Sequence, residues 1–200
     1  MFPDYTHSVL HSIPEERWLV QAQGVNECGC TTPANALNLL NQGEKFFDKD
    51  QLVREAGFWF QRRMGGTPSF VTATLLKRHG AGTHFGNLSR TNGERLLRDL
   101  LDQNISVCIE LGGNQVGPFT LYGEHAVLLV GYSDLFVDAA GGKHEEYYVI
   151  DAAYQGPDGS FGLHTNNLDR DGDGISEPYP GNRSIERPDF WANYPTGIYF

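Results

Sequence analysis

Hydrophobic residues change their spacing near residue 104, and this change constrains the fold more than any other feature of the sequence. Before it, apolar side chains recur at helical intervals, and after it they form the short alternating or continuous runs that are typical of strands. Helices followed by strands predict an α+β fold, with a helical half packed on an antiparallel β-sheet. The expected helices are 28–42 (or 31–42), 50–56, 67–80 and one from 91; the expected strands are 105–111, 126–130, 147–150 and an edge strand at 196–200.

Local signals predict the helix ends and the exposure of some side chains. Asp48 or Asp50 is expected to cap the second helix, Thr67 before Pro68 the third, and Thr91 the fourth. The strand at 105–111 alternates as if half-buried, with Cys108 on its polar side, and the aromatic cluster at 58–60 is expected in the core.

The chain is expected to form a single domain over residues 1–200. Its 200 residues and 40% hydrophobic content are sufficient for a substantial core. Residues 1–17 are polar, contain two prolines and are interpreted as an N-terminal arm. Residues 155–197 are rich in Gly, Pro, Asn and Asp and predict a long irregular region, which in a compact domain usually has a function.

Charge and cysteine content exclude several classes of function. The net charge of −10 argues against nucleic acid or an anionic membrane as partner, and no apolar run reaches the ~18 residues of a membrane span. No signal peptide is visible, so a cytoplasmic location is the default expectation. Three cysteines form neither a disulfide framework nor a zinc motif, and no organic cofactor is expected.

The segment 21–40 predicts a cysteine nucleophile. Cys28 stands before Gly29 at the start of the first expected helix, where the partial positive charge of the helix N-terminus favours a thiolate. An upstream glutamine side chain can donate a hydrogen bond to an oxyanion, together with the backbone N–H of Cys28.

A histidine and an aspartate at strand ends supply the other two members of a triad. His125 opens the apolar strand at 126–130, and Asp151 follows the strand at 147–150. If these strands pair as an antiparallel hairpin, His125 lies beside Asp151. Nucleophilic cysteine chemistry needs a base and a group that orients the base, so the sequence predicts a Cys28–His125–Asp151 triad.

The order of these motifs resembles papain-like cysteine peptidases. It runs Gln…Glu-Cys-Gly, then Gly-x-His-Ala-Val-Leu-Leu-Val-Gly-Tyr, then Tyr-Val-Ile-Asp, over roughly residues 18–155. The branch that it resembles most is the bacterial bacteriocin-processing peptidases, which cut double-glycine leader peptides, with their stand-alone relatives. The resemblance implies a papain-like fold, Cys28 as nucleophile, His125 as general base and acid, Asp151 as orienting group and Gln23 as oxyanion donor.

Two assignments stay open because the motif departs from that pattern. Cys30 occupies the place where this branch usually has a proline. Cys30 also competes with Cys28 as nucleophile, because the nucleophile of the plant-type branch is the second cysteine of Cys-Gly-x-Cys. Here the spacing is Cys-Gly-Cys and no tryptophan follows, which favours Cys28. Gln21 competes with Gln23 as oxyanion donor. Gln23 is preferred because Gly24 lets the chain turn toward the helix.

A second motif, in residues 169–177, predicts calcium binding. Carboxylates at positions 1, 3, 5 and 9, glycine at position 6 and a backbone carbonyl at position 7 match the first part of a calcium loop. Position 12 is Pro180, so the loop is similar to the short Asp-x-Asp-x-Asp-Gly loops of extracellular bacterial proteins, which favours export. The expected ligands of a structural calcium ion are Asp169, Asp171, Asp173, Glu177 and the carbonyl of Ile175.

The sequence therefore predicts a cysteine peptidase that hydrolyses peptide or amide bonds through an acyl-enzyme, with a peptide or protein as substrate. Two alternatives stay open: an acyltransferase or deamidase on the same triad, and a catalytically silent domain that binds peptides. The substrate sequence and the oligomeric state are not readable from the residues.

Overall fold

The computed structural model describes residues 21–41, 45–60, 66–81, 84–87, 90–112, 114–116, 119–122, 125–137, 141–153, 167–168, 177–178, 181–193 and 196–199. In these residues the chain is a mixture of helices and antiparallel sheet, as expected. The N-terminal arm at 1–17 lies outside the described residues. None of the described helices combines the length and apolar character that crossing a membrane requires.

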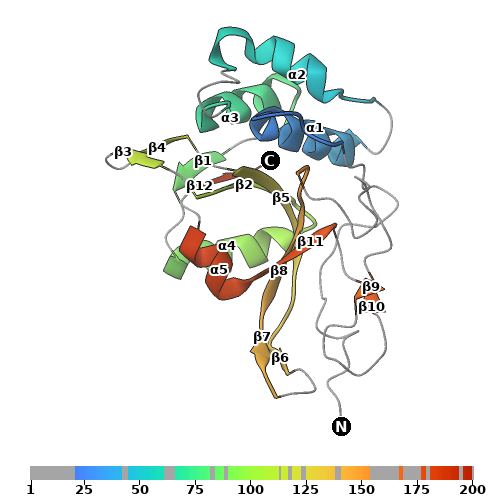
Figure 1. Ribbon diagram of the computed structural model, residues 1–200, viewed down its shortest axis with the longest axis vertical. Coiled ribbons are helices and arrows are strands. Elements are labelled where there is room, and N and C mark those ends of the chain that lie inside the picture. The colour runs from blue at the N-terminus through green and yellow to red at the C-terminus, as the bar shows by residue number, and fades with distance from the viewer. Residues whose placement is uncertain are drawn as a thin grey trace.

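Six strands form the central sheet, in the order β1–β12–β2–β5–β8–β11, with every neighbouring pair antiparallel (Figure 1). The expected pairing of the strands at 126–130 and 147–150 is confirmed, because β5 lies beside β8 with Leu128 opposite Ile150. The strands are β1 (His84–Asn87), β2 (Val107–Leu111), β5 (His125–Tyr132), β8 (Glu146–Ile150), β11 (Arg183–Glu186) and β12 (Thr196–Tyr199). Two-stranded ribbons within the described residues pair β3 (Asn114–Val116) with β4 (Phe119–Tyr122), β6 (Phe136–Val137) with β7 (Lys143–His144), and β9 (Asn167–Leu168) with β10 (Glu177–Pro178).

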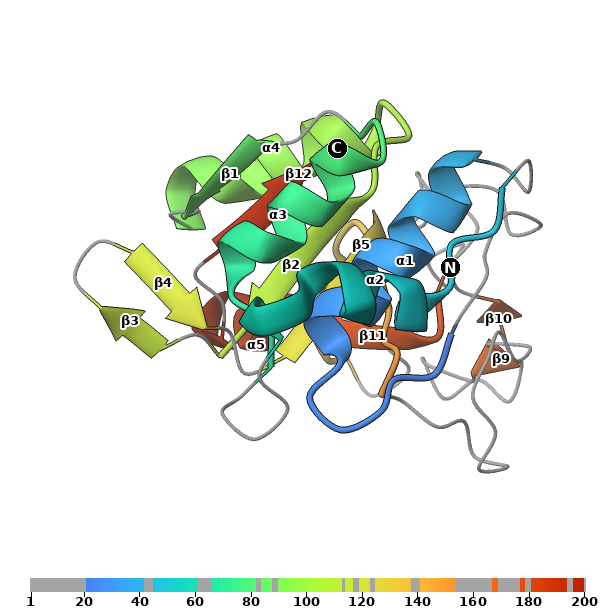
Figure 2. The ribbon, with the colours of Figure 1, turned by 90° about the horizontal axis from the view of Figure 1, so that it is seen from above.

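Helices cover both faces of this sheet (Figures 1 and 2). One face packs against α1 (Cys28–Asn41) and α3 (Ser69–Arg78), with α2 (Lys49–Ala56) packed on these two helices, and the apolar cluster of this side includes Leu37, Leu76 and Leu128. The other face packs against α4 (Arg90–Leu101) and α5 (Arg187–Asn193) through a second cluster that includes Leu97 and Phe190. The expectation of one helical half on one side is therefore incomplete, because α4 belongs to the opposite layer.

The double covering corrects the interpretation of β2. Cys108 and Ile109 do point to opposite faces, but both are buried, each in a different apolar cluster. Alternation in a sequence indicates a half-buried strand only when one face of the sheet is solvated. Here neither face is, so Cys108 is a core residue and does not lie on a polar side.

The C-terminal region is more regular than expected. Within 155–197, β11 and α5 are regular elements, and β12 is an interior strand that pairs with both β1 and β2. The expectation of an edge strand at 196–200 is therefore wrong. The edge next to β12 is β1, a four-residue strand that contains a glycine and carries little strand signal of its own.

Helix ends and aromatic residues supply further corrections. Asp48 caps α2 by accepting from Asp50, as one of the two alternatives predicted. In contrast, α3 has Pro68 at its N-cap without a side-chain bond, and α4 begins at Arg90, so neither Thr67 nor Thr91 has the expected capping position. Phe58 and Trp59 are 82% and 50% exposed, so these two residues of the aromatic cluster lie outside the core; a short 3₁₀ turn, Gly57–Trp59, places them at the surface.

Candidate active site

His125 and Asp151 come together at the end of the β5–β8 hairpin. His125 is the first residue of β5, and Asp151 directly follows β8. The imidazole Nε2 lies 2.7 Å from Asp151 Oδ1. Asp151 is only 1% exposed, whereas the His125 side chain is 23% exposed, so the carboxylate is enclosed and the ring faces outward.

Cys28 reaches the same histidine from the helical layer. It opens α1 and lies within hydrogen-bonding reach of His125. Since Nε2 is engaged by Asp151, Nδ1 is the ring nitrogen available to the thiol. Burial by itself would lower the pKa of His125, but the hydrogen bonds and negative charges of Asp151 and Cys28 outweigh it and raise that pKa to about 9. The imidazole therefore carries a proton at neutral pH.

Two residues of β11 and the segment before it complete the surroundings of Asp151. Arg183 Nη1 donates to Asp151 Oδ2 at 2.8 Å, and the backbone N–H of Ala153 donates to Oδ1 at 2.9 Å. Asn182 binds the backbone of Asp151 on both sides, accepting from its N–H and donating to its C=O. Burial acts to raise the pKa of Asp151, but the bonds from His125, Arg183 and Ala153 prevail and lower it, so the carboxylate stays ionised.

Sequence reasoning missed Arg183 and Asn182. They lie 32 and 31 residues after Asp151, in a region without hydrophobic periodicity. The short apolar signal at Ile185 is too weak to predict β11. Only the antiparallel pairing of β11 with β8, which sets Arg183 opposite Val149, brings them to the site.

The two candidate oxyanion glutamines differ in their hydrogen bonds. Both ends of the Gln21 carboxamide are engaged: its Nε2 donates to the Phe47 carbonyl at 2.8 Å, and its Oε1 accepts from the Lys49 N–H at 2.9 Å. Gln23 lies next to the segment that carries Asp151, because its backbone N–H donates to the Ala152 carbonyl at 3.0 Å. Its buried Oε1 has no partner among the described residues. Gln21 therefore has a structural position between α1 and α2, whereas the carboxamide oxygen of Gln23 has no partner among the described residues and its backbone binds the residue after Asp151.

The turn between Gln23 and Cys28 is held by a buried carboxylate. Glu27 is 3% exposed, accepts from the Gly24 N–H at 2.8 Å and forms an ion pair with Lys49 at 2.7 Å. A Cβ on Gly24 would lie 2.6 Å from Glu27 Oε2, so a larger residue there would require the Glu27 carboxylate to move. Asn26 takes a left-handed conformation at φ 59° in the same turn. These contacts fix the direction in which the chain enters α1.

The first turns of α1 are joined to α3 at the point where a proline interrupts the helix. Pro33 has no N–H to donate to the Gly29 carbonyl, four residues before it. Thr72 Oγ1 on α3 donates to that carbonyl instead, at 2.9 Å. The side chain of Thr67 lies against Cys30 Sγ at 3.3 Å, which is why it does not cap α3. The end of α1 that carries Cys28 is thus held by side chains of its neighbour.

All three thiols are buried, but those of Cys30 and Cys108 lie in the apolar core, whereas that of Cys28 contacts His125. Burial raises the pKa of Cys30 to about 11 despite the hydrogen bond with Thr67, and burial also raises the pKa of Cys108. Both belong to the core cluster between the sheet and α1–α3. A thiol that stays protonated in the core is a poor nucleophile, so this geometry favours Cys28 over Cys30.

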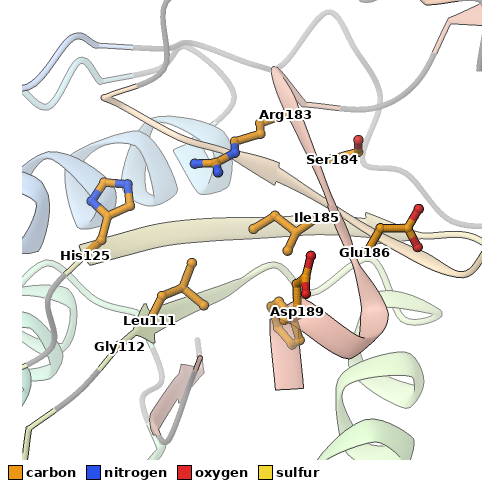
Figure 3. Close-up of a pocket in the computed structure, with 9 residues that line it drawn as sticks. Leu111, Gly112, His125, Arg183, Ser184, Ile185, Glu186 and Asp189 are labelled. Carbon is orange, nitrogen blue, oxygen red and sulfur yellow. The ribbon is translucent and has the colours of Figure 1, made fainter. Parts of the chain in front are cut away.

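A pocket of about 510 Å³ opens beside His125 on the sheet side of the site (Figure 3). Apolar residues and charged residues of both signs line it, and the whole of β11 contributes to the lining. The residues that line it are Leu111, Gly112, His125, Arg183, Ser184, Ile185, Glu186, Asp189 and Phe190.

The predicted calcium ligands cannot be placed. Asp169, Asp171, Asp173 and Ile175 lie outside the described residues, and of Glu177 only the backbone, in β10, is described. Within the part of the chain that is described, no cluster of three or more His, Cys, Asp and Glu side chains is arranged to hold a metal ion.

Comparison with protein-family models and with curated protein sequences finds no match to this chain. The functional assignment therefore depends on the geometry of Cys28, His125 and Asp151.

Proposed function

We propose that this chain is a cysteine hydrolase with a papain-like fold, acting on peptide or amide bonds. The observation that carries the proposal is the position of His125 between a buried, ionised carboxylate and the thiol at the start of a helix. Acyl transfer through a thioester requires a nucleophile that contacts a base, and a base that contacts an orienting group.

In the proposed reaction the reactive form of the site has a thiolate at Cys28 and a proton on His125. The thiolate attacks the substrate carbonyl, and the oxyanion accepts hydrogen bonds from the Cys28 N–H and from the Gln23 amide. A half-turn of that carboxamide exchanges the places of Oε1 and Nε2. His125 gives its proton to the leaving amine as the C–N bond breaks, and then takes a proton from the water that releases the acyl group.

Two contacts support the assignment of Asp151 as the orienting group. Its Oδ1 engages Nε2, which keeps Nδ1 directed toward the thiol. Its Oδ2 is bound by Arg183, so the carboxylate cannot rotate away from the ring without breaking an ion pair. The function of such a group is to hold the imidazole and to stabilise its protonated form.

The test is covalent labelling by an epoxide or fluoromethylketone peptidase inhibitor, measured by intact mass. We expect one adduct, located on Cys28, that is lost in Cys28→Ala and in His125→Ala. Cys30→Ala and Cys108→Ala serve as controls and should keep the adduct, provided that circular dichroism shows them folded. Labelling that persists in Cys28→Ala but disappears in Cys30→Ala would overturn the assignment. Absence of any adduct in the unmodified protein would favour a silent peptide-binding domain.

A further inference from the structure

Asp151 stands where the pairing between β8 and β11 ends. Arg183 is opposite Val149, so a continuation of the same register would set Gly181 opposite Asp151. Gly181 is in a left-handed conformation at φ 78°, and a Cβ there would lie 2.3 Å from the Val149 carbonyl oxygen. Only glycine fits this turn. The chain therefore leaves the strand pairing before it reaches Asp151.

The side chain of Asn182 acts as the strand partner of Asp151. The backbone N–H of Asn182 donates to the Val149 carbonyl at 2.9 Å, which places the residue beside the end of β8. Its Oδ1 accepts from the Asp151 N–H at 2.7 Å, and its Nδ2 donates to the Asp151 carbonyl at 2.9 Å. Buried backbone groups require such partners, and one carboxamide here supplies both.

Asn182 affects the site only through Asp151. It is 3% exposed, and the residues that line the pocket beside His125 do not include it. The next residue, Arg183, extends toward His125 and binds Asp151 Oδ2 (Figure 3). Consecutive residues thus bind different parts of Asp151: Asn182 its main chain, and Arg183 its carboxylate.

We propose that Asn182 is a positioning residue of the triad, which fixes the main chain of Asp151 and thereby the direction in which its carboxylate meets His125. The inference rests on the proposed hydrolase function and adds to it a residue that the substrate does not contact. Asp151 Oδ1 lies 2.7 Å from Nε2, and a hydrogen bond weakens steeply as its angle departs from linear. A main chain free to rotate at Asp151 would move this oxygen out of line with the ring.

The loss of this contact has a predictable effect on His125. Burial acts to lower the pKa of His125, and the bond from Asp151 is the first of the contacts that together raise it to about 9. A carboxylate displaced from Nε2 stabilises the protonated imidazole less, so the pKa of His125 should fall. Asn182→Ala retains all the charged or titratable groups around the ring, which are Cys28, Asp151, Arg183, Glu186 and Asp189.

The test is inactivation of the whole chain by a peptidyl fluoromethylketone, measured against inhibitor concentration and pH. We expect Asn182→Ala to reduce the limiting rate of inactivation by about 10–100-fold, because a misplacement of about 1 Å can cost 10²-fold. The inhibitor concentration that gives half of this rate should not change, since Asn182 does not line the pocket. The alkaline limb of the pH profile should move to lower pH.

Asn38→Ala is a matched control from the same chain. Asn38 is 6% exposed, and its carboxamide binds the backbone of Phe47 in the same way, accepting from the N–H at 2.7 Å and donating to the C=O at 2.9 Å. Phe47 belongs to the apolar cluster on the helical side of the sheet. Asn38→Ala should lower the melting temperature about as much as Asn182→Ala, but should leave the limiting rate and the pH profile in place.

Asn182→Ser provides a second variant. Its hydroxyl can bind one of the two backbone groups of Asp151, so we expect a limiting rate between those of the unmodified protein and Asn182→Ala. If Asn182→Ala does not fold, Asn182→Ser is compared with Asn38→Ala in its place.

The outcomes separate the positioning role from the hydrolase function. A folded Asn182 variant with the limiting rate and pH profile of the unmodified protein overturns the positioning role and leaves the hydrolase intact. So does a loss of rate that Asn38→Ala reproduces, because it would reflect stability alone. Absence of an adduct on Cys28 in the unmodified protein contradicts the hydrolase proposal, and the positioning role is then rejected with it.

Discussion

Asp151 shares its carboxylate between two positively charged groups, with His125 on Oδ1 and Arg183 on Oδ2. The Arg183→Gln substitution removes a positive charge that disfavours the protonated form of the His125 imidazole. The pKa of His125 should then rise further above its value of about 9, and the alkaline limb of the pH–rate profile should move to higher pH. The rate should also fall, because Asp151 loses the bond that fixes its orientation.

The measurement is the pH dependence of inactivation by a peptidyl fluoromethylketone. Arg183→Lys is the matched control, since it keeps the charge and loses the planar fork. It should leave the alkaline limb nearly in place. An Arg183→Gln profile superimposable on that of the unmodified protein would show that the contact has no electrostatic effect on the site.

A second prediction compares the base with its orienting group. His125→Ala should reduce hydrolysis by about 10²–10⁴-fold, the usual contribution of a general base. Asp151→Asn should cost less, because a neutral amide oxygen can still accept from Nε2 and hold the ring. The comparison requires both variants to be folded by circular dichroism, since Asp151 is buried and binds Arg183 and Ala153 as well. Equal losses would show that the charge of Asp151, and not its position, is what matters.

The contacts between His125 and Asp151 could be predicted from the sequence because both residues flank strong apolar runs that pair as a hairpin. The support from Asn182 and Arg183 could not, because those residues belong to a strand without a pattern of its own. The choice between Gln21 and Gln23 also required coordinates. It depends on the hydrogen bonds of the Gln21 carboxamide to the Phe47 carbonyl and the Lys49 N–H, and the spacing of residues in the sequence does not predict such contacts.

At the level of elements, the strength of the local signal decided which predictions were correct. The strands β5 and β8 have continuous apolar runs, and α2 has a capping aspartate, and each was placed nearly to the residue. The short elements β1, β11 and α5 were missed, because four to seven residues carry too little periodicity. The interior position of β12 was missed because sheet order depends on pairings between strands far apart in sequence.

A buried hydrogen bond between α3 and β2 leads to a prediction about pH and stability. Ser69 at the start of α3 donates to Glu110 on β2, and both side chains are buried. Burial raises the pKa of Glu110 to about 7, and the bond from Ser69 opposes this only in part. The folded protein therefore holds a proton that the unfolded chain loses at a pH near 4.5, the ordinary value for glutamate.

The sign of the effect follows from this difference in proton binding. Between about pH 4.5 and pH 7 the folded state binds more protons than the unfolded state, so the free energy of unfolding should fall as the pH rises. Glu110→Gln keeps an oxygen to accept from Ser69 and cannot ionise. It should lack this loss and be more stable than the unmodified protein at pH 8, by up to about 3 kcal/mol.

Urea denaturation at pH 5 and pH 8 measures the difference. Ser69→Ala is the informative partner variant: without the donor, the ionised carboxylate is still less favourable, and the loss of stability toward pH 8 should be larger. Parallel pH dependences for the unmodified protein and Glu110→Gln would contradict the buried, protonated carboxyl.

At the scale of the whole molecule, the candidate site lies where two layers meet. Cys28 comes from the helical layer, and His125 and Asp151 come from one end of the central sheet. Thr32 Oγ1 of α1 also donates to the Ala126 carbonyl at 2.9 Å, one residue from the histidine. The relative position of nucleophile and base is therefore set by packing between layers. Changes in the core between α1 and β5 should affect the reactivity of Cys28 before they affect the fold.

The last prediction concerns calcium and is independent of the triad. Asp169, Asp171, Asp173 and Glu177 place four carboxylates within nine residues, with glycine at the sixth position and the Ile175 carbonyl at the seventh. Carboxylates so close in sequence repel one another unless a cation binds between them, and calcium takes such oxygen ligands at about 2.3–2.6 Å. A ligand that binds only the folded state stabilises it by about 2.7 kcal/mol at a concentration one hundred times Kd.

Millimolar calcium should therefore raise the melting temperature and protect residues 160–185 from proteolysis, and magnesium should do so poorly, because it requires a stricter octahedral geometry. Asp171→Ala should remove the calcium effect while leaving the labelling of Cys28 by the fluoromethylketone unchanged. This pairing separates a structural ion from a catalytic one, since loss of a catalytic ion would reduce both. A melting curve that responds to neither calcium nor chelator would identify residues 169–177 as an acidic turn without a bound cation.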